Sequence, residues 1–417
     1  MVQSRLMPIY VSTFILFIGQ SFVGPFMSLW LRQVIGESSF LRLGLVLSFP
    51  MVISLIGILG ISNLTDHFGY YRQAIILISL VGMAQYLVLT QINTAFEYLL
   101  VASLGALVFP AYYTIALALA TNICHPSDKG KTTNYMLLFA SAGFFLGSLY
   151  AGTGYEELGM EWMLLFAAIL TGVSGLIIFA VPKTLKQDTS RVTVTVNPIN
   201  PPLAHTEMTE TGIIFNKKES IFTIVKRPRI ILILLCIGIL DFCSGGFFIF
   251  GTIYINERGK LPYKWIGYGN GVATLLACFL LWRLGKYVDQ HGRRFVFILG
   301  LLNYPLIFIV LSFFRQPLIV FLIWCLPLYA ILRPTASAMI ADLTLEHERS
   351  RGLSLLVISS NLSMTIGALY IGWAVDHYKI AIDLIIILPA LLAWFAVFVA
   401  IIFVKETLTI SKPEVHI

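Results

Sequence analysis

Two short stretches of the sequence decide the fold: Asp66-His67-Phe68-Gly69-Tyr70-Tyr71-Arg72 and Asp289-Gln290-His291-Gly292-Arg293-Arg294. Each stretch places an acid, a glycine three residues later and then arginine, and each lies between two long apolar runs. The two acids are 223 residues apart, so the same pattern occupies a similar depth in each half of the chain. A pattern that occurs twice in this way indicates a duplicated architecture more strongly than a single copy would.

The sequence on either side of these loops is apolar enough to cross a membrane. Of its 417 residues, 58% are hydrophobic and 12% are charged, whereas a soluble protein carries about 25% charged residues. A helix that spans a bilayer needs about 20 mostly apolar residues, and it satisfies its own backbone hydrogen bonds where water is absent. We therefore expect an all-α integral membrane protein with twelve transmembrane helices, at residues 7–31, 43–64, 73–91, 97–122, 134–153, 161–182, 229–254, 264–284, 294–314, 317–341, 353–374 and 381–404.

The twelve predicted helices fall into two groups of six, separated by the one long polar segment of the chain. This segment contains Asn197-Pro198-Ile199-Asn200-Pro201-Pro202, a composition typical of a flexible linker. Phe109-Pro110 in the first half corresponds to Arg333-Pro334 in the second at almost the same spacing as the two loops. We expect an N-terminal six-helix bundle at 1–182, a cytoplasmic linker at 183–228 and a pseudo-symmetric C-terminal six-helix bundle at 229–417.

The net charge of +7 is explained by membrane topology and not by a nucleic-acid partner. With the N-terminus placed in the cytoplasm, most of the 28 Lys and Arg residues fall in cytoplasmic loops, in the linker or in the tails. This is the positive-inside bias that orients membrane proteins. We expect a multi-pass protein of the cell (plasma) membrane, with both termini cytoplasmic, the lipid bilayer around it and no nucleic acid bound. We also expect a monomer.

No pattern of enzyme chemistry is present in the sequence. The five cysteines lie in or beside apolar runs without a C-x-x-C spacing, and the seven histidines lie in loops or tails. There is no Gly-rich phosphate loop, no metal-binding spacing and no nucleophile–base set. We expect a protein that is not an enzyme and that holds no cofactor and no metal.

The two loops resemble the signature loop of the major facilitator superfamily of membrane transporters, and the resemblance covers the whole chain except the linker. It implies two bundles with the substrate site between them at mid-membrane. It also implies that the loop acids engage helix ends or Arg groups across the seam between the bundles in the outward-open state, as a latch that is broken in the other state. This gating role is assigned to Asp66, Gly69, Arg72, Asp289, Gly292, Arg293 and Arg294. The alternative is that these charges only fix the topology.

Within the superfamily, the sequence is nearest to the drug:proton antiporter branch but departs from it in two places. The branch has a Gly-Pro-rich motif where this chain has Gly147 and Gly152, and Ser148 stands in place of the proline. The fourth predicted helix has no Arg shortly before Gly105, where the branch usually has one. Plain packing of helices is therefore the preferred interpretation of the glycines.

Two ionisable residues, Asp241 and Arg333, lie deep in the predicted helices. Charges inside a membrane are costly and are therefore candidates for function. The resemblance implies that the first, fourth, seventh and tenth helices line the central cavity, which would bring both side chains there. A closed pair would keep Asp241 ionised for structure or substrate binding, whereas an unpaired, buried Asp241 would favour its neutral form and could take up a proton.

The remaining cavity residues are expected to be apolar and aromatic. In the internal repeat, Gln20 aligns with Asp241. Possible sites of helix kinks are Pro25, Pro110 and Pro334. The available aromatic side chains are Trp30, Tyr112, Tyr113, Phe247, Phe248, Trp324 and Tyr329. Aromatic walls with few polar anchors suit amphiphilic ligands. The predicted substrate or proton site consists of Asp241, Arg333, Gln20, Tyr112 and Tyr329.

The leading prediction for function is a secondary active transporter that moves a small amphiphilic solute by alternating access, as proton-coupled efflux. One alternative is a symporter or facilitator of sugars or organic anions, in which Arg333 would bind a carboxylate. The second loop fits the sugar porters, but Val181-Pro182-Lys183-Thr184 stands where their Pro-Glu-Ser-type sequence is expected. A further alternative is a membrane receptor that keeps the fold but does not transport.

Overall fold

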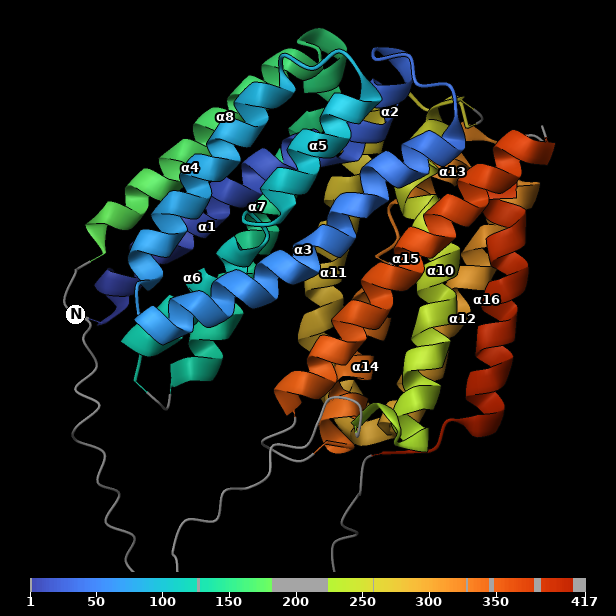
Figure 1. The fold of residues 1–417 in the computed structure, drawn as a ribbon. Helices are drawn as coiled ribbons and strands as arrows, with labels where there is room; N and C mark the ends of the chain where they lie inside the picture. Colours follow the sequence, from blue (N-terminus) through green and yellow to red (C-terminus); the bar gives the residue numbers. More distant parts are fainter. Residues whose placement is uncertain are drawn as a thin grey trace, which may run out of the picture.

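The computed structural model describes residues 2–125, 128–181, 224–257, 259–327, 329–344, 349–378 and 384–407. Within these residues the regular secondary structure is entirely helical (Figure 1). The N-terminal half contains α1 (Val2–Val23), η1 (Gly24–Phe26), α2 (Met27–Gln33), α3 (Phe40–Phe68), α4 (Tyr71–Leu89), α5 (Ala95–Ala106), α6 (Ala111–Ile123), α7 (Lys129–Glu157), α8 (Met160–Ile177) and η3 (Ile178–Ala180). The C-terminal half contains α10 (Pro228–Glu257), α11 (Tyr263–His291), α12 (Arg293–Phe313), α13 (Pro317–Trp324), α14 (Tyr329–Asp342), α15 (Arg349–Tyr378) and α16 (Leu384–Phe403).

Each predicted transmembrane run corresponds to one helix or to two consecutive helices. In the part of the chain that the structure describes, nine stretches are long and apolar enough to cross a membrane by themselves. The other three predicted runs correspond to α11, to the pair α13 and α14, and to α16. The tenth predicted run, 317–341, is divided between the two short helices α13 and α14. The first residues of the last predicted run, 381–404, lie outside the described residues.

Three of the membrane-crossing segments are interrupted. Pro25 lies in the 3-10 turn between α1 and α2, and Pro110 lies between α5 and α6. Both positions confirm the predicted kinks, because proline lacks the N–H that a continuous helix would use. The third predicted site differs: α14 continues through Pro334, and this segment is interrupted earlier, between Trp324 and Tyr329.

The two halves pack against each other along two seams. Helix α7 packs on α11, and α15 packs on α3. Since α3 and α11 are the second crossing segments of their halves, and α7 and α15 the fifth, the internal repeat relates one seam to the other. In Figure 1 the ribbons of the halves approach at the end where α2 stops and diverge at the end where α10 starts. We call these the far end and the linker end.

Glycine allows the helices of both seams to come close at the far end. A Cβ atom on Gly152 of α7 would lie 2.3 Å from the carbonyl oxygen of Tyr263 on α11. A Cβ atom on Gly372 of α15 would lie 2.5 Å from the carbonyl oxygen of Phe40 on α3. Both distances are too short for a real side chain, so the prediction that these glycines serve helix packing is confirmed at both positions.

Candidate functional site

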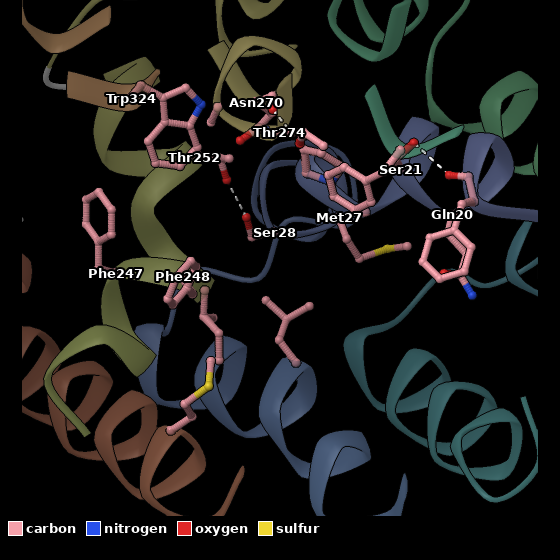
Figure 2. A pocket seen from close by; sticks show the side chains of 18 of the residues that line it. Gln20, Ser21, Met27, Ser28, Phe247, Phe248, Thr252, Asn270, Thr274 and Trp324 are labelled. Carbon is pink, nitrogen blue, oxygen red and sulfur yellow. Dashed lines mark hydrogen bonds between the residues drawn. The ribbon is translucent and has the colours of Figure 1, made fainter. Parts of the chain in front are cut away.

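A cavity of about 880 Å³ lies between the two halves. Its walls come from α1, η1, α2, α3, α5, α6 and α7 on one side and from α10, α11, α12, α13 and α15 on the other, as Figure 2 shows in part. Among the described residues that line it there is no Asp, Glu, Lys, Arg or His. The lining is mostly apolar and aromatic, with Phe17, Tyr98, Tyr113, Phe144, Phe247, Phe248 and Trp324 as its rings.

The aromatic rings of the cavity are held in place by their neighbours. Trp324 donates its indole N–H to the carbonyl oxygen of Ile266 at 3.1 Å, and its ring centroid lies 5.7 Å from that of Phe247. On the opposite wall the rings of Phe17 and Tyr113 meet edge to face at 5.8 Å. Edge-to-face pairs of this kind are favourable arrangements of aromatic rings. Both walls therefore present preformed aromatic surfaces to a ligand.

Among the seven hydroxyl groups of the described lining, those of Ser21, Ser28, Thr252 and Thr274 are hydrogen-bonded within the protein, whereas those of Tyr98, Tyr113 and Ser141 have no partner among the described residues. Ser28 of α2 and Thr252 of α10 bond to each other across the two halves at 2.7 Å, as drawn in Figure 2. The hydroxyl of Ser21 donates to the carbonyl oxygen of Phe17 in its own helix, at 2.8 Å. These groups are less available to a ligand, because a hydroxyl has one proton to donate.

Two amide side chains are available as well. Gln20 of α1 and Asn270 of α11 line the cavity from different halves, on different sides of the view in Figure 2. Neither side-chain amide has a hydrogen-bond partner among the described residues. Each amide can donate two hydrogen bonds and accept others. Gln20 was predicted at the site, whereas Asn270 was not, because a single Asn in an apolar run gave no pattern that marks it.

Asp241 and Arg333 form a closed ion pair outside the cavity lining. The Asp241 carboxylate accepts from the Arg333 guanidinium at 2.8 Å, and Ser360 of α15 is hydrogen-bonded to both side chains. Asp241 is only 4% exposed, while 35% of the Arg333 side chain is exposed. All three residues belong to the C-terminal half, so this cluster joins α10, α14 and α15. Of the two states considered from the sequence, the structure contains the closed pair.

Two aromatic residues predicted at the cavity, Tyr112 and Trp30, are not among its described lining residues. Tyr112 is 1% exposed, and its hydroxyl bonds to Ser12 in the core of the N-terminal half. Trp30 is buried as well, with 3% of its surface exposed. The expected cavity position is therefore wrong for Tyr112 and Trp30, since both point into packed protein. The side chain of Tyr329 lies outside the described part of the structure.

The first predicted gating loop makes its described contacts within the N-terminal half. Gly69 follows the end of α3 with φ at +70°, a left-handed conformation that glycine adopts without strain. Arg72 donates to the carbonyl oxygen of Phe179 at 2.8 Å. The side chain of Asp66 lies outside the described part of the structure.

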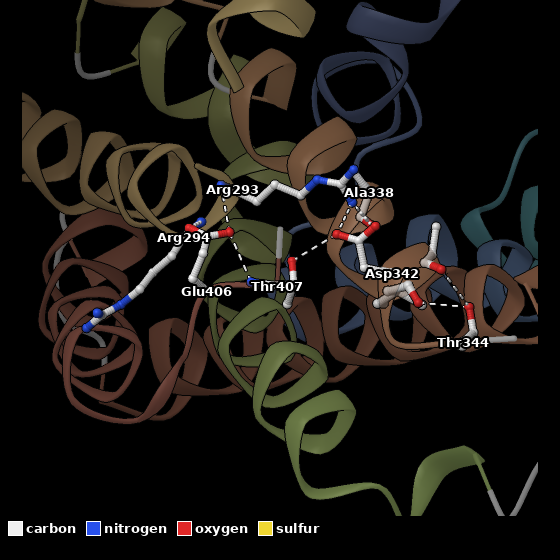
Figure 3. Close-up of polar contacts among 9 residues, drawn as sticks. Arg293, Arg294, Ala338, Asp342, Thr344, Glu406 and Thr407 are labelled. Carbon is white, nitrogen blue, oxygen red and sulfur yellow. Dashed lines mark hydrogen bonds and ion pairs between the residues drawn. The ribbon is translucent and has the colours of Figure 1, made fainter. Parts of the chain in front are cut away.

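The second loop is held by acids of its own half, shown in Figure 3. Gly292 has φ at +86°, and the backbone N–H groups of Arg293 and Arg294 each donate to the carboxylate of Glu406 at 3.0 Å. Arg293 also forms an ion pair with Asp342 at the end of α14. Glu406 and Asp342 were not among the predicted site residues, and the side chain of Asp289 lies outside the described part.

The whole chain is similar to one known protein family and to several solved structures. The family model described as Major Facilitator Superfamily matches residues 9–332 and 284–415. A mutant of the nucleoside transporter NupG has a TM-score of 0.78 at 12% identity, with 95% of this chain and 99% of that chain covered. A bacterial homolog of the human lysosomal transporter Spinster, in an inward-facing and unoccupied conformation, has a TM-score of 0.69 at 12% identity, with 96% and 98% covered.

An auto-inhibited peptide transporter of the POT family has a TM-score of 0.68 at 12% identity, with 95% of each chain covered. At these identities the three structures show a common fold and nothing about the solute. No curated protein has significant sequence similarity to the chain.

Proposed function

Because the chain belongs to the major facilitator superfamily and is thus a secondary transporter of small solutes and not an enzyme, we propose that it exports small, uncharged, amphiphilic compounds in exchange for protons. The observation that carries the substrate class is the lining of the cavity. It combines aromatic rings on both walls with two available amides, and the described lining residues carry no charge.

An apolar cavity of this kind selects against ions. A charged solute that enters it loses water, and the desolvation is compensated only by an opposite charge in the lining. An uncharged amphiphile instead buries its apolar face against rings such as Phe247 and uses its few polar groups on Gln20 and Asn270. The proposed solute therefore has an aromatic or apolar body and a small number of hydrogen-bonding groups.

The alternatives from the sequence find less support in this geometry. An organic anion would need the guanidinium of Arg333, which is already paired with Asp241 and is not among the described lining residues. A sugar would need many hydrogen-bonding groups around it, but most of the described lining is apolar, and hydroxyls such as that of Thr252 are bonded to other protein groups. A receptor that does not transport would have no need of a cavity shared by both halves.

The proposed proton coupling rests on Asp241, the only buried carboxyl group among the described residues. When the Asp241 carboxylate takes up a proton, it would give up its hydrogen bonds to Arg333 and Ser360, so protonation would release Arg333. Releasing a buried pair changes how α10, α14 and α15 are held together. An amphiphile crosses a bilayer unaided, so it needs a carrier only for movement against its concentration gradient. The proposed direction of this movement is export.

Binding of three probes of different charge tests the substrate class. We expect chloramphenicol, which is neutral, to raise the thermal unfolding temperature of the purified protein. Tetraphenylphosphonium, a cation, and fluorescein, an anion, should raise it little or not at all. A clear preference for either ion would contradict the proposal. Counterflow of radiolabelled chloramphenicol in proteoliposomes then separates a transporter from a receptor.

Two variants locate the polar contacts of the bound probe. Gln20→Ala and Asn270→Ala should each weaken chloramphenicol binding by about three- to tenfold, the loss of one net hydrogen bond. Ser21→Ala is the matched control, because the Ser21 hydroxyl lines the same cavity but is bonded within its own helix. Equal affinities of all three variants would show that the amides are not ligand contacts.

A further inference from the structure

The far end of the molecule contains a contact between the halves that the sequence did not predict. Asp376, in the last turn of α15, accepts hydrogen bonds from the backbone N–H groups of Phe40 at 3.0 Å and Leu41 at 2.9 Å. It also accepts from the hydroxyl of Ser39 at 2.7 Å. These three residues form the beginning of α3. A carboxylate of the C-terminal half therefore caps a helix of the N-terminal half.

The chemistry of this contact is that of a helix N-cap. The first N–H groups of a helix have no partner within it, and an acid that accepts from them is favoured further by the helix dipole. The usual capping residue comes from the chain just before the helix, as Ser39 does here by accepting from Arg42. Asp376 supplements that cap from another part of the molecule, so its bonds exist only while the two halves are together at this end.

Because α15 and α3 approach closely, the short side chain of Asp376 can reach the N-terminus of α3. Gly372 lies one turn before Asp376 on the same helix, and a Cβ atom there would be 2.5 Å from the carbonyl oxygen of Phe40. The backbones of α15 and α3 are thus almost in contact beside the cap. The other seam has no matching acid among its described contacts: Tyr155 of α7 packs on Tyr263 of α11 at 5.1 Å.

Two other polar contacts between the halves, at the outermost turns of α2 and α10, join flexible side chains. Arg32 of α2 pairs with Glu257 of α10 at 2.9 Å, with 23% and 36% of the side chains exposed. Gln33 donates to Asn256 at 3.3 Å. Exposed ion pairs contribute little to stability, because water screens them and both side chains lose freedom. Asp376 differs because its partners Phe40 and Leu41 present backbone groups that the helix already fixes.

We propose that Asp376 locks the far end: its carboxylate holds the first turn of α3 in the conformation in which the far end is closed, and the bonds must break for that end to open. Asp376 then sets the balance between the two conformations of the transport cycle. It is a positioning residue that acts through α3 and does not touch the solute. The proposal needs alternating access, which the family supplies, and does not depend on the substrate class or the coupling ion.

Distances between spin labels at the far end test the lock without any ligand. Val34→Cys, after α2, and Phe313→Cys, at the end of α12, are suitable label sites because 64% and 79% of these side chains are exposed. Of the five native cysteines, only Cys278 is not buried, so Cys278→Ser provides the background. The protein is measured in lipid nanodiscs by double electron–electron resonance, which reports the population of each distance.

Asp376→Asn is expected to add a longer distance and to raise the ratio of open to closed far end by about two- to thirtyfold, the range for the loss of an N-cap. Asn keeps the volume of Asp but offers one acceptor oxygen where the carboxylate offers two. Asp376→Glu keeps the charge and displaces it by one methylene, so it should give an intermediate ratio. If only one of the two variants folds, that variant alone decides the test.

Glu97→Gln is the matched control. Glu97 accepts from the backbone N–H groups of Asn93 at 2.7 Å and Thr94 at 3.2 Å, and so caps α5 at the same far end but within one half. It should lower thermal stability without changing the label distances. Glu257→Gln should give a smaller shift than Asp376→Asn. Distance distributions that are the same in Asp376→Asn, Glu97→Gln and the parent would overturn the proposal, whatever solute the protein carries.

Discussion

Replacing Asp241 by Asn separates a coupling role of the buried ion pair from a structural one. Removing one partner of a buried pair costs about 3–5 kcal/mol, because the other charge is left without compensation. Here the stranded group would be Arg333, and 35% of its side chain is exposed and can be hydrated. The expected loss is therefore at the lower end, about 3 kcal/mol, and Asn can still accept one hydrogen bond.

The converse variant should cost more. Arg333→Gln leaves the charge on Asp241, which is 4% exposed and retains only Ser360 as a partner in the cluster. In the double variant no charge is stranded, so most of the stability should return and the coupling free energy of the two sites should be about 3 kcal/mol. Unfolding in mixed micelles of sodium dodecyl sulfate and mild detergent measures these differences. Ser360→Ala is the control, since it removes the two hydrogen bonds that Ser360 makes to Arg333 and Asp241 but keeps the ion pair, at about 2 kcal/mol.

Transport then distinguishes the two roles in protein that folds. If protonation of Asp241 drives transport, Asp241→Asn resembles the protonated form. It should bind and exchange chloramphenicol but lose uphill movement driven by a pH gradient across proteoliposomes. Uphill transport that remains intact in well-folded Asp241→Asn would refute the coupling role. A coupling free energy near zero between Asp241 and Arg333 would refute the structural reasoning as well.

Two further predictions concern topology and the loops. A cysteine introduced near Asn200 in the linker should be protected from impermeant thiol reagents in intact cells while one near Lys260 reacts, and labelling of the linker from outside would reverse the proposed orientation. Asp66→Asn and Asp289→Asn should each slow transport and raise the population that is open at the linker end, with expression retained. Transport at the parental rate in both variants would leave the loops with a topological role only.

The architecture could be predicted because membrane insertion imposes strong rules on the sequence. A bilayer requires long apolar helices, and each of these runs is visible without knowledge of any contact. The breaks at Pro25 and Pro110 were predictable for a similarly local reason, since proline removes a backbone donor. The interruption between Trp324 and Tyr329 was not, because a proline does not break a helix wherever it occurs, as Pro334 inside α14 demonstrates.

Which face of each helix meets the cavity could not be predicted from the sequence. In a soluble protein the polar face of a helix marks the solvent, but in a membrane lipid and protein core are both apolar. Tyr112 and Tyr113 illustrate the limit: they are adjacent and alike, yet Tyr113 lines the cavity while Tyr112 lies in the core of its half. Asp376 was missed for a related reason, because two of its three partners are backbone groups, which leave no trace in side-chain composition.

The proposed lock at the far end and the latch expected at the linker end would use the same kind of contact, the lock in one conformation and the latch in the other. Each would place an acid at a helix terminus across the seam between the halves, so that each conformation gains one such contact and loses the other. Two conformations are both populated only if they differ by a few kcal/mol. Removing one acid should therefore bias the cycle, and removing both should restore the balance.

The double variant Asp376→Asn with Asp66→Asn tests this compensation. It should transport faster than either single variant, and its label distances at the far end should return toward those of the parent. Glu97→Gln with Asp66→Asn is the control, because Glu97 caps a helix within one half and cannot offset the loss of a contact between halves. If the double variant is as slow as the slower single variant, the two ends are not opposed, and Asp66 acts on something other than the balance of the two conformations.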